Sequence, residues 1–170
     1  LSSGLSIGGS AAAQRNIISG NTTYGISVSG TNAATGMKVQ GNYIGLDKNG
    51  DVISGATGSG VFVNGSTQGI LIGGATAGEG NVISGNQTYG ILYNNLAAGQ
   101  NFQILGNIIG LKPDGMTVAG NTSGIYAYIG STPTGSIMIG GSGAGQGNII
   151  SGNTQHGITF INASSSATFP

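Results

Sequence analysis

The hexapeptide Asn81-Val82-Ile83-Ser84-Gly85-Asn86 decides the fold, because the chain contains it three times with small changes. The other two copies, residues 16–21 and 148–153, both read Asn-Ile-Ile-Ser-Gly-Asn. Successive copies begin 65 and 67 residues apart, at residues 16, 81 and 148. Repetition at such a period is typical of a solenoid, in which each repeat packs only on its neighbours.

Short strand-like segments occupy the space between these copies. One set has the order apolar, any, apolar, any, Gly, the period of a strand with one buried face, at residues 5–9, 37–41, 70–74, 102–106 and 137–141. A second set is an Ile-Ser-Gly-like triplet at residues 18–20, 53–55, 83–85, 118–120 and 150–152. A third set starts with Gly and alternates again, at residues 25–28, 60–63, 90–93, 124–127 and 157–160.

The three segment types recur in one order five times, about every 33 residues. Strands this short cannot bury their apolar sides alone, but stacked coils bury them in a continuous column. We therefore predict an all-β fold, a single domain over residues 1–170, forming a parallel β-helix (β-solenoid) of about five coils with three short strands each. We expect right-handed winding, since parallel crossovers are overwhelmingly right-handed. Five coils at a spacing of roughly 4.8 Å give a rod of about 24 Å.

The alternation also predicts which residues stack in the core. The segments ending in Gly contribute two stacks, Leu5, Met37, Ile70, Phe102 and Ile137, and Ile7, Val39, Ile72, Ile104 and Ile139. The triplets and the third set contribute one stack each, Ile18, Ile53, Ile83, Val118 and Ile150, and Ile26, Val61, Ile91, Ile125 and Ile158.

One asparagine follows the triplet glycine in four coils, at positions 21, 86, 121 and 153. Stacked asparagine amides can hydrogen-bond to one another along a solenoid. Ala56 interrupts this ladder in the second coil. The alternative is that asparagine is present because it tolerates the left-handed conformation of a tight corner. The two interpretations are compatible.

The composition excludes several classes of function. Charged residues make up only 5% of the chain, against about 25% in ordinary domains, and the net charge is zero. Four basic residues cannot neutralise a run of phosphates, so we expect no nucleic-acid partner. They cannot form a polybasic membrane patch, and no apolar run approaches the roughly 20 residues needed to span a bilayer, so we expect no membrane insertion. The chain has no cysteine and begins without a signal-peptide pattern. A surface this poor in charge favours packing against other molecules, copies of the same chain included.

The repeats resemble a known class of sequence. Gly41-Asn42-Tyr43-Ile44-Gly45-Leu46 and residues 106–111, Gly-Asn-Ile-Ile-Gly-Leu, alternate with the Ile-Gly-Gly coils. Together with the hexapeptides, they resemble right-handed β-helix repeats of large bacterial and archaeal surface proteins. The resemblance covers essentially the whole chain, and is looser to the pectin-lyase-like superfamily. It implies an extracellular or cell-surface location. That superfamily includes polysaccharide lyases, hydrolases, tail-spike proteins and adhesins, so the fold does not choose the function.

The acidic residues do not indicate an active site. They are only Asp47, Asp51, Glu79 and Asp114. Asp47 and Asp51 lie near enough in sequence to reach the roughly 5 to 9.5 Å separation of a glycosidase pair. However, the residues between them are typical of a polar turn. We therefore expect that the protein is not an enzyme and has no catalytic residues.

Metal and cofactor sites are also not expected. Asp47, Asn49 and Asp51 alternate as calcium ligands do, but Val52 stands where that loop type needs glycine, so calcium is only a weak alternative. The single histidine, His156, shares a register with Tyr24 and Tyr89, which favours a structural role. The basic residues are scattered, at Arg15, Lys38, Lys48 and Lys112.

Three functional hypotheses remain. The first is a non-enzymatic extracellular subunit that assembles with copies of itself, end to end or side by side, into a fibre, sheath or surface layer. It rests on the low charge, the missing active site and the absence of a polar cap before Leu5 or in the tail 163–170. Such ends equally fit a segment of a longer rod.

The second hypothesis is a polysaccharide-binding module of an adhesin. Its candidate contacts are outward aromatic residues, which offer apolar faces to sugars, although they are scattered over several coils: Tyr24, Phe62, Tyr89 and Tyr126. The third hypothesis, a polysaccharide lyase or hydrolase, has the least support.

Overall fold

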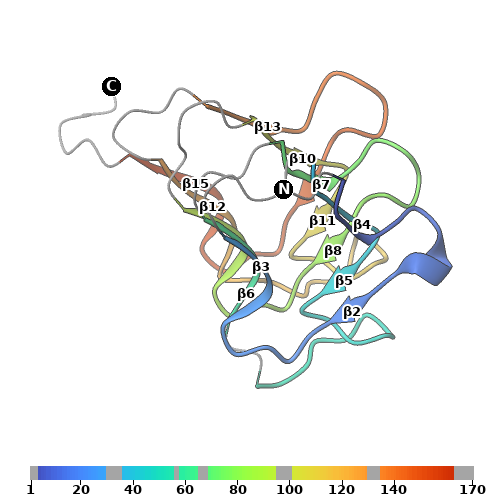
Figure 1. Ribbon diagram of the computed structural model, residues 1–170. Helices are drawn as coiled ribbons and strands as arrows, with labels where there is room; N and C mark the ends of the chain where they lie inside the picture. The colour runs from blue at the N-terminus through green and yellow to red at the C-terminus, as the bar shows by residue number, and fades with distance from the viewer. Residues whose placement is uncertain are drawn as a thin grey trace.

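The computed structural model describes residues 4–29, 36–55, 58–64, 69–94, 101–129 and 135–162. Within them the chain forms a β-solenoid of three parallel sheets with five strands each, arranged as three walls around one core (Figure 1). Among the described residues, the only helical turn is a short 3₁₀ element, η1 (Ala12–Gln14). No helix in these segments is long and apolar enough to span a membrane.

Each sheet takes one strand from every coil, and the chain visits the sheets in the same order each time. Sheet A consists of β1 (Ser6–Gly8), β4 (Lys38–Gln40), β7 (Leu71–Gly73), β10 (Asn101–Leu105) and β13 (Ser136–Ile139). Sheet B consists of β2 (Ile17–Ile18), β5 (Tyr43–Ile44), β8 (Val82–Ile83), β11 (Ile108–Ile109) and β14 (Ile149–Ile150). Sheet C consists of β3 (Tyr24–Ser29), β6 (Ser59–Asn64), β9 (Tyr89–Asn94), β12 (Ser123–Ile129) and β15 (His156–Asn162).

This arrangement confirms the β-solenoid and most of the predicted core. All strand pairs are parallel, and partners in neighbouring coils are about one repeat apart, as with Ile7, Val39 and Ile72 in sheet A. Three of the four predicted stacks form in the expected register, and their middle members, such as Ile72 and Ile91, are fully buried. The handedness of the winding stays a prediction.

The stack predicted from the triplets is wrong in two coils. In sheet B the partners of Ile18 and Ile83 are Ile44 and Ile109, both fully buried, and not Ile53 and Val118. Val118 is 64% exposed. The Gly-Asn-x-Ile-Gly strings therefore supply the strands of coils two and four.

The misplacement has a simple cause, which is an insertion in each of these two coils. Ten residues separate Ile109 from Gly120, whereas Ser84 alone separates Ile83 from Gly85. The second coil has the same extra length between Ile44 and Gly55. We call residues 45–54 insert 1 and residues 110–119 insert 2. A single antiparallel bridge closes each insert, Leu46 with Val52 and Leu111 with Val118.

Two asparagine ladders run along the solenoid. In the longer one, each Nδ2 donates to the Oδ1 of the asparagine in the next coil, at 2.8 to 3.1 Å, through Asn16, Asn42, Asn81, Asn107 and Asn148. This ladder was not predicted from the sequence. The shorter one was predicted and links Asn86, Asn121 and Asn153 at 2.9 Å. The predicted interruption, Ala56, lies outside the described residues.

Candidate functional site

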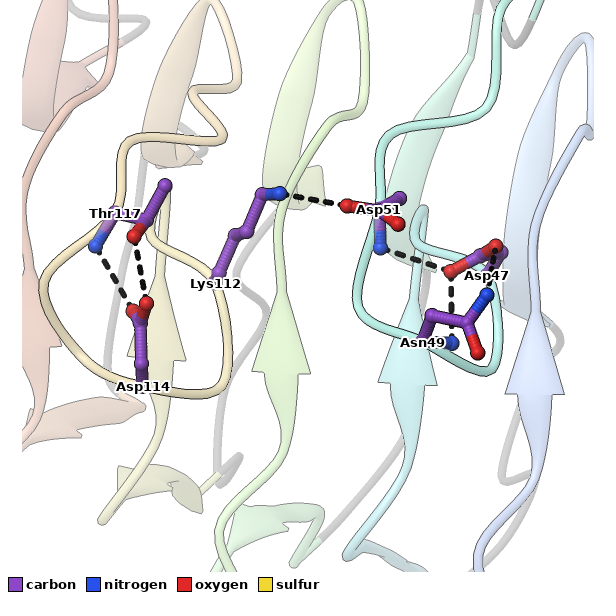
Figure 2. A network of polar contacts seen from close by, with 6 residues as sticks. All are labelled: Asp47, Asn49, Asp51, Lys112, Asp114 and Thr117. Atoms are coloured by element: carbon purple, nitrogen blue, oxygen red, sulfur yellow. Dashed lines mark hydrogen bonds and ion pairs between the residues drawn. The ribbon is translucent and has the colours of Figure 1, made fainter.

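The acidic residues singled out from the sequence lie mainly on the two inserts, which stand side by side on the outer face of sheet B (Figure 2). Leu46 of insert 1 and Ala119 of insert 2 cover Val82, and all three are buried. The inserts also touch directly, because a Cβ on Gly50 would lie 2.7 Å from Cδ of Pro113. Coils two and four therefore meet across coil three.

Coil three provides the base on which insert 2 rests. The buried Ser84 hydroxyl accepts a hydrogen bond from the Gly110 N–H at 2.9 Å and donates one to the Leu111 carbonyl at 2.7 Å. The Gly85 N–H donates to the carbonyl of Ala119 at 2.7 Å. Both stems of the insert are thereby fixed, so its polar residues have defined positions.

Asp47 stabilises the turn of insert 1. Its Oδ1 accepts hydrogen bonds from the N–H groups of Asn49 and Asp51, each at 2.8 Å (Figure 2). The Asp51 N–H bond is the largest cause that lowers the pKa of Asp47 below its usual value. A general acid in glycoside hydrolysis needs a raised pKa. The carboxyl of Asp47 has the opposite shift, so it does not suit that role.

Asp51 points away from Asp47, toward insert 2. Its Oδ1 forms an ion pair with Nζ of Lys112 at 2.6 Å, the contact that joins the inserts in Figure 2. Hydrogen bonding to Asp51 is the largest cause that raises the pKa of Lys112. The two carboxylates of insert 1 therefore do not converge on a common ligand.

Asp114 performs in insert 2 the role of Asp47 in insert 1. It accepts hydrogen bonds from Thr117 Oγ1 at 2.6 Å and from the N–H groups of Thr117 and Met116 at 2.8 Å. The Thr117 hydroxyl contributes most to lowering the pKa of Asp114 to about 2. The carboxylate is thus an anionic turn cap.

The calcium alternative finds no support in this geometry. Asn49 approaches Asp47 through its Nδ2, at 3.4 Å from Oδ2, and Asp51 is held by Lys112. In the described segments, no three residues among Asp, Glu, His and Cys are grouped as metal ligands.

The remaining charged candidates lie apart from the inserts, except Lys48, which belongs to insert 1. Glu79 accepts the N–H of Thr76 in a turn at 3.0 Å. The guanidinium of Arg15 lies 4.2 Å above the ring of Tyr43. His156 begins β15 in the register predicted for it, opposite Ser123. Lys38 lies on β4, and Lys48 Nζ donates to Asn49 Oδ1 at 3.0 Å.

The aromatic residues, in contrast, are brought together on the outer face of sheet C. They lie on four different coils and form no single column, as the sequence indicated, but the structure pairs them across neighbouring coils. Phe62, Leu92 and Tyr126 form one column in register across β6, β9 and β12. Tyr24 stacks on Phe62 with ring centroids 4.2 Å apart, and Tyr89 lies against Tyr126 at 4.6 Å. We call these five residues the outer aromatic face.

Hydroxyl groups border this face. A groove of about 290 Å³ runs between Tyr24 and Tyr89, and Ser59 and Thr88 line it. The hydroxyls of Ser59 and Thr88 hydrogen-bond to each other at 2.7 Å. A partly exposed row of rings next to hydroxyls offers both apolar stacking and hydrogen bonding to a ligand.

Comparison with known proteins adds no assignment. No family model matches the chain, and neither a curated protein nor a solved structure is significantly similar to it.

Proposed function

We propose that this chain is a non-enzymatic, extracellular structural protein, a β-solenoid subunit that assembles with copies of itself into a fibre, sheath or surface layer. The observation that carries the proposal is the asparagine ladder through all five coils, from Asn16 to Asn148. The ladder supports a structural role, in which the function of the protein is to form a mechanically stable solenoid. We also propose that its repeats belong with the right-handed β-helix repeats of surface proteins.

The direction of the hydrogen bonds fits a mechanical role. Strand-to-strand bonds in a solenoid run along its axis, so axial extension must break whole sheets. The ladder adds side-chain amides in the same direction. Asn81 and Asn107, for example, are each 1% exposed, where water does not compete for their bonds.

The low charge of the chain fits close packing between subunits. Four basic and four acidic residues give a net charge of zero. One acidic and one basic residue, Asp51 and Lys112, already neutralise each other at the inserts. Little electrostatic repulsion therefore opposes contact between copies.

Sedimentation velocity over a concentration series, with electron microscopy of the same samples, tests this proposal. We expect particles much larger than the 16.5 kDa chain, growing with protein concentration. A single monomeric species at every concentration would contradict self-assembly.

The outer aromatic face supports a second candidate function, binding of polysaccharide. Rings of Tyr24, Phe62, Tyr89 and Tyr126 are half-buried on one side of one sheet and present apolar area to a sugar ring. Affinity electrophoresis in gels that contain neutral or acidic polysaccharides is the test.

For this candidate, we expect Tyr126→Ala to reduce retardation severalfold. Met116→Ala, on insert 2 and 80% exposed, is the control and should leave it unchanged. Equal mobility of the unmodified chain in every gel would exclude glycan binding.

A further inference from the structure

The long asparagine ladder has a direction, so the two ends of the solenoid differ. In each of the first four coils the backbone N–H and Nδ2 of the asparagine donate to Oδ1 of the next one, as Asn107 donates both to Asn148 at 2.9 and 3.0 Å. Asn16 receives no such bond within the described segments, and its Oδ1 is a free acceptor there. Asn148 has no following asparagine among the described residues, so its N–H and second amide hydrogen are donors without a ladder partner.

The face of the last coil presents apolar side chains that point toward the core. Ile158 and Phe160 stand in register with Ile125 and Ala127. The latter two are 1% and 0% exposed, whereas Ile158 is 43% and Phe160 is 46% exposed. These two residues therefore lack the cover that a following coil gives to the equivalent positions elsewhere.

The face of the first coil is hollow and apolar in part. A cavity of about 730 Å³ opens there, and its lining includes Ile7, Asn16 and Ile18. Leu5 precedes Ile7 by two residues and is 47% exposed, while Met37, one coil further, is 6% exposed. The first and last coils also lack inserts in their described corners, so no inserted loop blocks either face.

We propose that copies of this chain stack head to tail, with the last coil of one copy seated on the first coil of the next. This rests on the proposed self-assembly and names its interface. The three sheets continue across the junction, Ile158 and Phe160 are covered, and Asn148 donates to Asn16 Oδ1 of the neighbour. A second copy fits because the donors of Asn148 on the last coil meet the acceptor oxygen of Asn16 on the first coil, in the register of the ladder. The described part of the last coil, residues 135–162, has no Asp, Glu, Lys or Arg, so the two faces do not repel each other through like charges.

Such a contact joins two different faces of the same molecule. Contacts of this kind close into rings or grow as open filaments, depending on the rotation between copies. Continuation of a straight solenoid gives a filament, with about 24 Å added per copy at the usual strand spacing.

Two blocking variants of the full chain test the interface. Ile158→Lys places a charge on the last-coil face, and Leu5→Lys places one on the first-coil face. Each site is exposed enough for a lysine to reach water in the free chain. Ile161→Lys is the matched control, because Ile161 is 40% exposed on the same strand but pairs with Tyr128 on the outer face. Circular dichroism must first show that all variants keep the spectrum of the unmodified chain.

Sedimentation velocity of the separate and mixed variants then gives the result. We expect Ile161→Lys to assemble like the unmodified chain, and Ile158→Lys and Leu5→Lys to be monomers alone. Mixed together, they should form a one-to-one dimer, because each keeps one open face. Monomers in the mixture would overturn the head-to-tail interface.

The failures of the two proposals are distinguishable. If Ile161→Lys blocks assembly and Ile158→Lys does not, copies pack side by side through sheet C; self-assembly stands and the head-to-tail inference fails. If the unmodified chain is monomeric, a following coil of a longer polypeptide is the better occupant of the open faces, and both proposals fail.

Discussion

Replacement of Asn81 by alanine should remove most of the stability that the long ladder provides in the middle of the solenoid. The Asn81 Oδ1 accepts bonds from the N–H and Nδ2 of Asn42 at 3.0 and 3.1 Å. Its Nδ2 donates to the Val39 carbonyl at 2.7 Å and to Asn107 Oδ1 at 2.9 Å. The substitution deletes all four bonds among buried residues.

The size of the effect follows from which groups lose their partners. Asn42 Nδ2 keeps the Ile7 and Gln40 carbonyls, and Asn107 Oδ1 keeps the Asn81 N–H. The Asn42 N–H, in contrast, stays buried without an acceptor. An unsatisfied buried donor costs about 1–3 kcal/mol, and each lost bond about 1 kcal/mol. The Asn42 N–H and the three other lost bonds together give an expected loss of about 4–6 kcal/mol in the free energy of unfolding for Asn81→Ala.

Asn16→Ala is the matched control, because it changes the same residue type at the exposed end of the ladder. It deletes one bond, from Nδ2 to Asn42 Oδ1 at 2.8 Å, and that oxygen keeps the Asn16 N–H at 3.1 Å. The expected loss is about 1 kcal/mol. Urea unfolding followed by circular dichroism measures both, with the slope m compared between variants. Equal losses for the two variants, at unchanged m, would refute the reasoning.

Three further predictions concern single positions. Gly73→Ala should destabilise the fold by about 3 kcal/mol or more, because the φ of Gly73 is +86° and a Cβ there would lie 1.9 Å from the Leu105 carbonyl oxygen. Gly55 has a φ of +92° but no atom within 4 Å of an added Cβ, so Gly55→Ala should cost only about 1–2 kcal/mol. Chemical denaturation measures both losses. The pKa of Asp114 is about 2 in the folded chain against an ordinary 3.8, so the stability that its carboxylate gives the fold is present above pH 4 and is lost as the pH falls toward 2. Asp114→Asn should therefore reduce the fall in Tm between pH 4 and pH 2. An unchanged fall in Tm would contradict the role of Asp114 as an anionic turn cap. Burial raises the pKa of Tyr93 to about 12, so an ultraviolet titration should show a tyrosinate step near that pH that is missing in Tyr93→Phe.

The strand pattern predicts the solenoid because it repeats at the level of single side chains. Apolar residues at alternate positions, such as Ile70 and Ile72, need a buried face, and only stacking of successive coils provides it. The predicted registers of sheets A and C follow directly from this periodicity.

The error at Ile53 and Val118 shows the limit of such alignment. The triplet Ile53-Ser54-Gly55 resembles the strand triplet around Ile83 more closely than Tyr43-Ile44-Gly45 does, so comparison of the triplets alone selects the wrong segment. A signal was present in the asparagine that precedes each true strand by one residue, as at Asn42 and Asn81.

The sequence by itself determined the architecture, the coil length and most of the core, because the strand alternation and the glycine corners are local patterns that recur in every repeat. Only the tertiary structure decided which residues from different coils meet. Stacking of parallel strands aligned Phe62, Leu92 and Tyr126 into one column, and two insertions met across coil three to pair Asp51 with Lys112. These contacts join residues 30 to 61 positions apart in the chain, and their geometry follows from the register between coils, which no local pattern encodes.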